Sequence, residues 1–407
     1  MAQVRERGAT YSHIHIQVEG KTRGRQGFHT FSHVQVSRHL NALGSTFSIR
    51  FPNRWILTRK GDFDFVGGRS CRIFIRDNQI ILDGFIEKVS TGVDDQSHTI
   101  QVSGRDRTGD LIDCSPANFP QFTNQSLFQT MQTVCKPFGI PVAGSNVDNH
   151  VFPQAKLRPG ETVFSFLNRL SKQRGLLLCN IPKVGGGIQL CRPGSGSYKT
   201  ARLDANNILQ GTVETDMTQI FSEYNVLSQQ TSPVSFLDDD QIGQPETQTS
   251  VVGRVEDKTV QRYRPKTLMA EKTSSPAQAL SRARWESSRR AAQALRIKVT
   301  VSGWLNTDND IWRENHQVNV DYPPLGVRGR YLIAQVNYVY GAQVSQKTEI
   351  SLIHKDAYRI EKVVTTEQVS SAINLEWKRE DFEKFFKESK IDSKPYLETK
   401  NRGAKAD

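Results

Sequence analysis

Hydrophobic and polar residues alternate through much of the first hundred positions. In TYSHIHIQVEG, His13 and His15 fall on one face of an extended strand, and the isoleucines and Val18 fall on the other. SHVQVSRHL, STFSIRF and HTIQVSG repeat this pattern. SCRIFIRDNQIILDGFIEKVSTG predicts a hairpin that turns at Asp77-Asn78. Short strands separated by turns predict a small β-barrel or sandwich over residues 1–115.

The pattern changes to a helical period between residues 116 and 205. Leu127, Met131 and Val134 form an apolar stripe in TNQSLFQTMQTVCKPFG, which Thr123 or Asn124 can cap and Gly139 can end. RPGETVFSFLNRLSKQRG predicts a second helix, and LLLCNIP predicts a buried strand. This section is therefore expected to be an α+β domain.

Strand patterns return over residues 206–358. A polar stretch that includes Asp238, Asp239 and Asp240 interrupts them and is expected to be a loop. PAQALSRARWESSRRAAQAL predicts a helix that begins at Pro276, with Ser274 or Ser275 as its cap. Four more strands follow, so the fold class is mainly β, with two strand-rich units around an α+β insert.

Residues 359–407 are a charged tail that contains a few aromatic residues. Phe382 and Phe386 are four positions apart, so a helix would place them on one face beside Phe385. Trp377 lies just before them. We expect a short amphipathic helix followed by a disordered segment, with these four aromatic residues contacting a partner.

The chain has 407 residues and a formal net charge of +12, which permits contact with nucleic acid. The 54 Lys and Arg residues are spread along the chain and form no basic block. The amino terminus lacks a signal-peptide pattern, and no segment is apolar enough to span a membrane. Five cysteines without a CxxC pair predict buried thiols in a protein that folds in the cytoplasm.

Candidate chemistry is sparse. The cysteines lie in apolar runs, where an inert thiol is expected, and GGGIQLCRPGSGS lacks the spacing of a P-loop. Histidines gather near the amino terminus (His13, His15, His29, His33 and His39), but solvent-facing positions on a strand explain them without a metal. Arg282, Arg289 and Arg296 share a helix face that either follows phosphates, pairs with Glu286 or meets a partner subunit. We expect no catalytic, cofactor or metal site.

The densest group of charges is SGRDRTGDLIDC at residues 103–114. Arginine and carboxylate side chains at this spacing can form several charge-assisted hydrogen bonds, and the glycines permit sharp turns. We expect a structural polar network where the first barrel passes into the next domain. Its members are Arg105, Asp106, Arg107, Asp110 and Asp113.

The same stretch resembles a known family. Residues Ile80 to Ile86 and Gly104 to Asp113 resemble the first-barrel pattern of the baseplate hub of contractile-tailed phages of the Mu type (tail protein P), a family related to the late-control D proteins and the T-even phage hub. A second block resembles the second barrel of that family, in the right order along the chain. It includes Gly303-Trp304, Ile311-Trp312, Asn315, Val318-Asn319-Val320, Leu332-Ile333 and Leu352.

The resemblance implies a homotrimer in which each chain supplies two similar small β-barrels around the α+β domain. Such a ring would adapt a sixfold tail tube to a threefold central spike and leave a channel through which DNA passes. The implied partners are other copies of the chain, the tube protein, the spike protein and further baseplate proteins, in a virion assembled in the host cytoplasm. A DNA-binding protein and a hub with an associated cell-wall hydrolase remain the alternatives.

Overall fold

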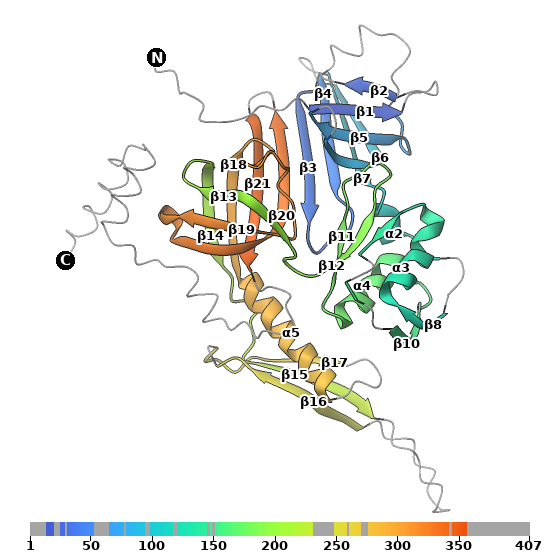
Figure 1. Cartoon of the computed structure of the whole chain (residues 1–407), viewed down its shortest axis with the longest axis vertical. Coiled ribbons are helices and arrows are strands. Elements are labelled where there is room, and N and C mark those ends of the chain that lie inside the picture. Colours follow the sequence, from blue (N-terminus) through green and yellow to red (C-terminus); the bar gives the residue numbers. More distant parts are fainter. Residues whose placement is uncertain are drawn as a thin grey trace, which may run out of the picture.

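The computed structural model is predominantly β. It describes residues 14–19, 25–28, 31–52, 65–76, 79–93, 98–116, 121–144, 147–148, 151–230, 248–258, 260–269, 276–341 and 344–355. Within these ranges the strands form one sheet of 13 strands and three small sheets (Figure 1). The mainly β fold expected from the alternating sequence pattern is confirmed.

The first β unit occupies one end of the large sheet. Its strands are β1 (Ile14–Glu19), β2 (Arg25–Phe28), β3 (His33–His39), β4 (Thr46–Pro52), β5 (Ser70–Ile75), β6 (Gln79–Val93) and β7 (His98–Asp106). They are hydrogen-bonded in the order β2-β1-β5-β6-β7-β4-β3. The alternating isoleucines of β1 face inward as the sequence predicted, and β5 and β6 form the expected hairpin.

The second β unit occupies the other end of the sheet. Its strands are β13 (Gly196–Asp204), β14 (Ile208–Thr215), β18 (Leu295–Ser302), β19 (His316–Tyr322), β20 (Val327–Gly341) and β21 (Val344–His354), with a 3-10 turn η2 (Pro323–Leu325) between β19 and β20. The pairing order is β13-β19-β20-β21-β18-β14.

The two units share one plan of strand pairing. The order β1-β5-β6-β7-β4-β3 corresponds to β13-β19-β20-β21-β18-β14. The long β6 skips one residue of its ladder with β7 immediately after Ile86, and the long β20 skips one residue of its ladder with β21 immediately after Ile333. A β-bulge at the same place in both units indicates that the two units share one strand arrangement. They differ at one edge, because β1 runs antiparallel to β5 whereas β13 runs parallel to β19.

The units are joined edge to edge. The second half of β20 pairs with β21 on one side and, antiparallel, with β3 on the other. Tyr338 lies opposite Val36 in this seam, and both side chains are buried. The seam makes the large sheet continuous from one unit to the other, a connection that no local sequence pattern predicts.

The α+β section lies below the first unit in Figure 1 and has its own core. Its elements are α2 (Gly109–Asp113), β8 (Gln121–Ser126), α3 (Leu127–Cys135), η1 (Lys136–Phe138), β9 (Val142–Ala143), β10 (Val151–Lys156), α4 (Val163–Gln173), β11 (Leu177–Asn180) and β12 (Ile188–Cys191). The predicted stripe of α3 is buried in this core.

The cap of α3 differs from the prediction. Thr123 and Asn124, the predicted caps, are part of strand β8, which pairs with β10. They therefore do not cap the helix. Ser126 caps the helix instead, and Gln129 completes a reciprocal capping box. The predicted end is confirmed, since Gly139 adopts a left-handed conformation directly after η1.

A small sheet and the longest described helix form a separate layer. The strands are β15 (Glu223–Gln230), β16 (Gln248–Glu256) and β17 (Pro265–Met269), and the helix is α5 (Pro276–Ala294). Ala279 and Ala283 pack on Tyr224 and Val226 of β15. The helix begins at Pro276 as predicted and continues directly into β18, so it ties this layer to the second unit (Figure 1). Among the described residues no helix has the length and apolarity needed to cross a membrane.

Candidate functional site

The end of β7 carries the charged stretch singled out by the sequence. Arg105 lies between two carboxylates. Its Nε donates to Glu87 at 2.8 Å and its guanidinium also donates to Asp113 of α2. The Arg105 hydrogen bonds lower the pKa of the Asp113 carboxyl. Because these carboxylates are largely exposed, the bridge orients α2 against β6 and contributes little free energy.

Asp106 points the other way, into the protein. It accepts hydrogen bonds from the backbone amide of Ser45 (2.6 Å), the amide of Thr108 (2.8 Å) and the hydroxyl of Thr108 (2.5 Å). The side-chain amide of Asn180 donates to it from β11. Burial raises the pKa of Asp106, and the hydrogen bonds from Thr108 and Ser45 oppose that rise. Asp106 therefore fastens the first unit to the α+β section through neutral donors.

Arg107 pairs with an acid that sequence reasoning did not select. Its Nε donates to Asp83 at 3.2 Å, and Arg72 donates to the other oxygen of Asp83 at 2.8 Å. The backbone amide of Gly185 also donates to Asp83. Asp110 lies exposed in the first turn of α2, and the structure assigns its side chain no hydrogen bond within the described part of the chain. Of the five predicted residues, only Arg105 and Asp113 contact each other as an ion pair.

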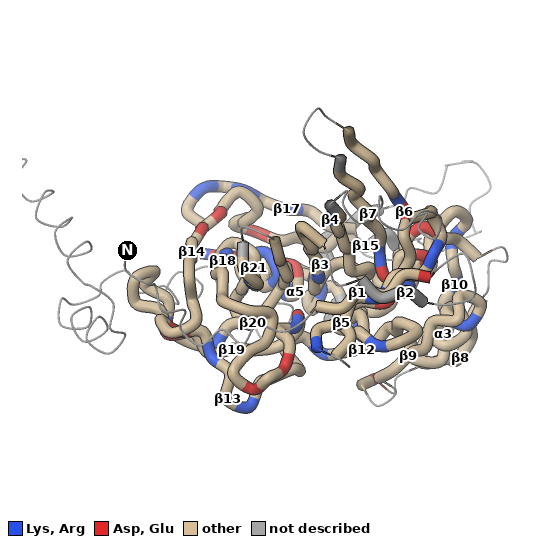
Figure 2. Tube along the Cα trace, turned by 90° about the horizontal axis from the view of Figure 1, so that it is seen from above, with Lys and Arg blue, Asp and Glu red and all other residues tan. Residues whose placement is uncertain are grey.

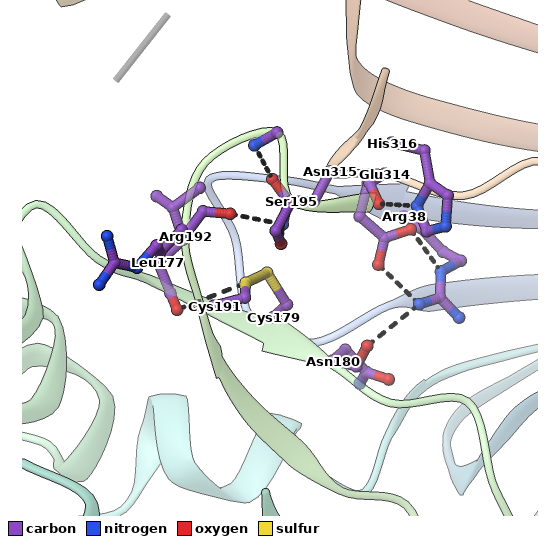
Figure 3. Close-up of a disulfide and its surroundings, with 11 residues drawn as sticks. Arg38, Leu177, Cys179, Asn180, Cys191, Arg192, Ser195, Glu314, Asn315 and His316 are labelled. Atoms are coloured by element: carbon purple, nitrogen blue, oxygen red, sulfur yellow. Dashed lines mark hydrogen bonds and ion pairs between the residues drawn. A yellow bond between two sulfur atoms is a disulfide. The ribbon is translucent and has the colours of Figure 1, made fainter. Parts of the chain in front are cut away.

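A second polar centre lies where the three sections of the chain meet (Figure 3). Arg38 of β3 is 1% exposed, and its guanidinium donates to both carboxylate oxygens of Glu314, at 2.6 and 2.9 Å. Its remaining donors reach the carbonyls of Ile81 and Asn180, each at 3.3 Å. One side chain thus contacts β3, β6, β11 and the segment before β19.

Electrostatics at this centre favour the charged pair. Burial alone would raise the pKa of Glu314, but the adjacent Arg38 more than offsets it and the pKa is lowered. The sequence held one signal for the pair: Arg38 shares the inward face of β3 with Val34 and Val36. An arginine on an apolar strand face requires a buried acidic partner. No pattern in the sequence indicated that Glu314 is this partner.

A disulfide lies beside this centre. Cys179 of β11 and Cys191 of β12 are joined on adjacent strands (Figure 3). The expectation of five buried thiols was wrong for this pair, because the antiparallel pairing of two apolar runs brings the sulfurs together. Cys71 and Cys135 are free and buried, and burial raises the pKa of the Cys135 thiol to about 12. Cys114 is free but exposed, so the expectation of a buried thiol was wrong there as well.

The other candidate residues form no reactive cluster in the described ranges. No group of three or more potential metal ligands occurs there, although His13 and His29 lie outside those ranges. Glu286 pairs with Arg289 and Arg290, and Arg282 and Arg289 stack on Trp285. Arg296 does not share their helix face as expected, because the helix ends at Ala294 and Arg296 lies in β18. Figure 2 shows basic and acidic residues interspersed along the described trace. The predicted partner residues Trp377, Phe382, Phe385 and Phe386 lie outside the described residues.

Family models match three parts of this chain. Residues 13–106 match the N-terminal domain described as "Mu phage baseplate assembly protein GpP-like", and residues 275–361 match the fourth domain of the Mu phage baseplate assembly protein GpP. Residues 108–190 match the second domain described as "baseplate hub protein gp44-like". The matches fall on the first unit, the second unit and the α+β section.

Whole-chain comparisons agree with these matches. The baseplate hub protein gp44 of Escherichia phage Mu is 29% identical over 287 residues, which are 69% of this chain and 74% of that protein. The 43 kDa tail protein of prophage MuSo2 from Shewanella oneidensis is 25% identical, with a TM-score of 0.70 over 85% of this chain and 99% of that one. A tail protein from Neisseria meningitidis MC58 shares the fold, with 18% identity and a TM-score of 0.68 over 88% of this chain and 99% of that one.

The fold and its three matched domains define a phage tail protein. The chain belongs to the family of Mu-type baseplate hub proteins. The resemblance noted from the sequence is therefore confirmed, and the polar centre around Arg38 is a junction between sections of the chain.

Proposed function

We propose that this hub protein works as a homotrimeric symmetry adapter without enzymatic activity. Three chains with two β units each would form a ring of six units. The sixfold face would receive the tail tube, the threefold face would hold the central spike, and the ring would leave a channel for DNA.

The matched ladders of the two units carry this proposal. A closed ring with sixfold character can form from three chains only if each chain presents the same surface twice. The shared strand order and the bulges after Ile86 and Ile333 supply that repetition. The seam between β3 and β20 already holds two neighbouring units side by side.

Light scattering on the purified chain tests the trimer. The proposal expects a species with three times the chain mass of 45.9 kDa, and a ring of six lobes by negative-stain microscopy. A monomer at every concentration tested, with and without the tube and spike proteins, contradicts it. Tight, salt-dependent binding of DNA by the isolated chain would instead favour the DNA-binding alternative.

The proposed partners are the tube protein and the spike protein of the same particle, with other baseplate proteins beside them in a virion assembled in the host cytoplasm. We assign the contact with such baseplate or tail-interior proteins to Trp377, Phe382, Phe385 and Phe386. Removing residues 374–407 should weaken baseplate assembly and leave the trimer intact. A truncated chain that enters particles as efficiently as the full chain would remove this assignment.

A further inference from the structure

We propose that the contact between α4 and α5 is a binding site for a phosphate group, formed by Lys172, Arg282 and Arg289. These three residues are called the α4–α5 basic cluster below. The proposal goes beyond the symmetry adapter, because the cluster lies within one chain and needs no second copy. Its ligand is the free phosphate ion or a phosphate monoester, which carries about two negative charges near neutral pH.

Two arginines of α5 lie over the same tryptophan ring. The guanidinium carbon of Arg282 is 5.6 Å from the centre of the Trp285 ring, and that of Arg289 is 5.3 Å from it. Seven residues make about two turns of an α-helix, so Arg282 and Arg289 project from the same side of α5. Trp285 is buried, and its ring therefore gives both cations a fixed surface on which to lie.

The third cation comes from the α+β section. Leu177 of β11 packs against the hydrophobic cluster that contains Trp285, and Lys172 lies just before that strand, in the last turn of α4. Partial burial lowers the pKa of the Lys172 ammonium, and the positive charges of Arg289 and Arg282 lower it further. The end of α4 and this side of α5 thus bring three cations close together (Figure 1).

Acidic residues neutralise only part of this charge. Glu286 accepts hydrogen bonds from Arg289 at 3.0 Å and from Arg290 at 2.6 Å, so two guanidinium groups share one carboxylate. Within the described ranges Lys172 and Arg282 form no ion pair, and the Nε of Arg289 is buried without an acceptor. Like charges at this distance repel each other, so the cluster favours binding of an anion.

The end of α4 does not account for these cations. Basic side chains often interact with the free carbonyls of a helix C-terminus. Here the carbonyls of Ser171 and Lys172 already accept backbone amides from the turn that follows α4. The positive charge therefore remains available to a ligand.

A phosphate group suits the cluster better than other common anions. Guanidinium groups bind phosphate oxygens through paired hydrogen bonds, and an ammonium group binds them as a point charge. A carboxylate or a phosphodiester of DNA carries a single charge, so three cations favour the doubly charged ion. Lys172 and Arg282 are exposed, and a small ion can reach both. Bound there, it would link the α+β section to α5.

Isothermal titration calorimetry of the full chain with inorganic phosphate tests the site, at pH 7.5 and at constant ionic strength set with sodium chloride. We expect saturable binding of one phosphate per chain. Arg282→Gln should weaken this binding about tenfold or more, because a charge-assisted hydrogen bond is lost. Arg284→Gln is the matched control. Arg284 is exposed and lies two positions along α5, on nearly the opposite side of the helix, so its variant should bind like the wild type.

Absence of saturable binding, or equal weakening in the Arg282→Gln and Arg284→Gln variants, overturns the site. A nucleoside monophosphate and a dinucleotide with one internal phosphodiester distinguish the sources of the phosphate. Binding of the monophosphate as tight as that of the ion assigns the site to monoesters, and weaker binding assigns it to the free ion. A phosphodiester that binds as tightly as inorganic phosphate contradicts the argument from charge.

A second variant keeps the test decisive. If Arg282→Gln fails to fold by circular dichroism, Lys172→Gln replaces an exposed side chain of the same cluster and should lose phosphate binding to a similar degree. Unchanged binding in a folded Lys172→Gln variant overturns the site. None of these results bears on the trimer, which light scattering tests separately.

Discussion

Arg38 and Glu314 form a buried two-pronged ion pair across 276 positions of sequence, at 2.6 and 2.9 Å. The pair joins the first β unit to the second, and the carbonyl of Asn180 brings the α+β section to the same guanidinium. The pair therefore helps to hold the two units in a fixed relative position, which the proposed ring of six units would require.

Replacing Glu314 with Gln should destabilise the protein strongly. The change leaves the Arg38 charge buried without its counter-charge, for which a loss of about 3–5 kcal/mol is expected. The free energy of unfolding from denaturant titration measures it. Asp321→Asn is the control, since the ion pair of Asp321 with Arg328 is exposed and should contribute less than about 1 kcal/mol. Equal losses in the two variants would show that the buried pair has no special role.

Two histidines near Glu314 predict a dependence on pH. Burial lowers the pKa of both His39 and His316 below the ordinary value of 6.5. The unfolded chain then binds more protons than the folded chain once the pH falls below that value, so the free energy of unfolding should decrease as the pH is lowered from 7.5 toward 5.5.

His316→Gln should flatten this slope. The variant is expected to be less stable at every pH, because the His316 ring packs on Tyr198 with centroids 4.8 Å apart. The slope is therefore the informative quantity. An unchanged slope between pH 7.5 and 5.5 would assign the titration to other groups.

A side chain at position 104, now Gly104, is predicted to clash with the neighbouring strand. A Cβ atom there would lie 1.9 Å from the carbonyl oxygen of Phe85, which belongs to the backbone of β6 and cannot move aside. Gly104→Ala should cost at least about 2 kcal/mol or prevent folding. At Gly67 a Cβ would have no contact closer than 3.7 Å, so Gly67→Ala is the matched control and should stay near wild type in thermal unfolding.

The disulfide predicts a labelling pattern. After denaturation without reductant, an alkylating reagent should modify three cysteines per chain, leaving Cys179 and Cys191 protected. Reduction should expose all five and, from closure of a short loop, lower the free energy of unfolding by about 3 kcal/mol. Mass spectrometry counts the labels. Five labels without reductant would restore the expectation of free thiols.

Local structure was largely predictable from the sequence. The alternation in β1 and the start of α5 at Pro276 follow from side-chain periodicity and from the tolerance of a first helical turn for proline. The cap of α3 was not predictable from the sequence. Thr123 and Asn124 are residue types that cap helices well, but they lie in β8, which pairs with β10.

Contacts between residues far apart in the chain could not be predicted from the sequence, for a physical reason. The charged stretch at 103–114 contains Arg105 and Asp113, which are eight positions apart and contact each other. Asp106, by contrast, is satisfied by Ser45 and Asn180, which are 61 and 74 positions away. The type of a residue shows which hydrogen bonds its side chain can make. Which partner it meets depends on how distant strands pair.

The most direct test is a reconstruction of the hub bound to its tail tube, computed without imposed symmetry. We expect three copies of the chain, whose six β units follow each other around the axis at nearly equal angles, alternating between first and second units. A hub that contains one copy or six copies of the chain, or three copies whose two units lie at different radii, would contradict the claim that one chain presents the same face twice.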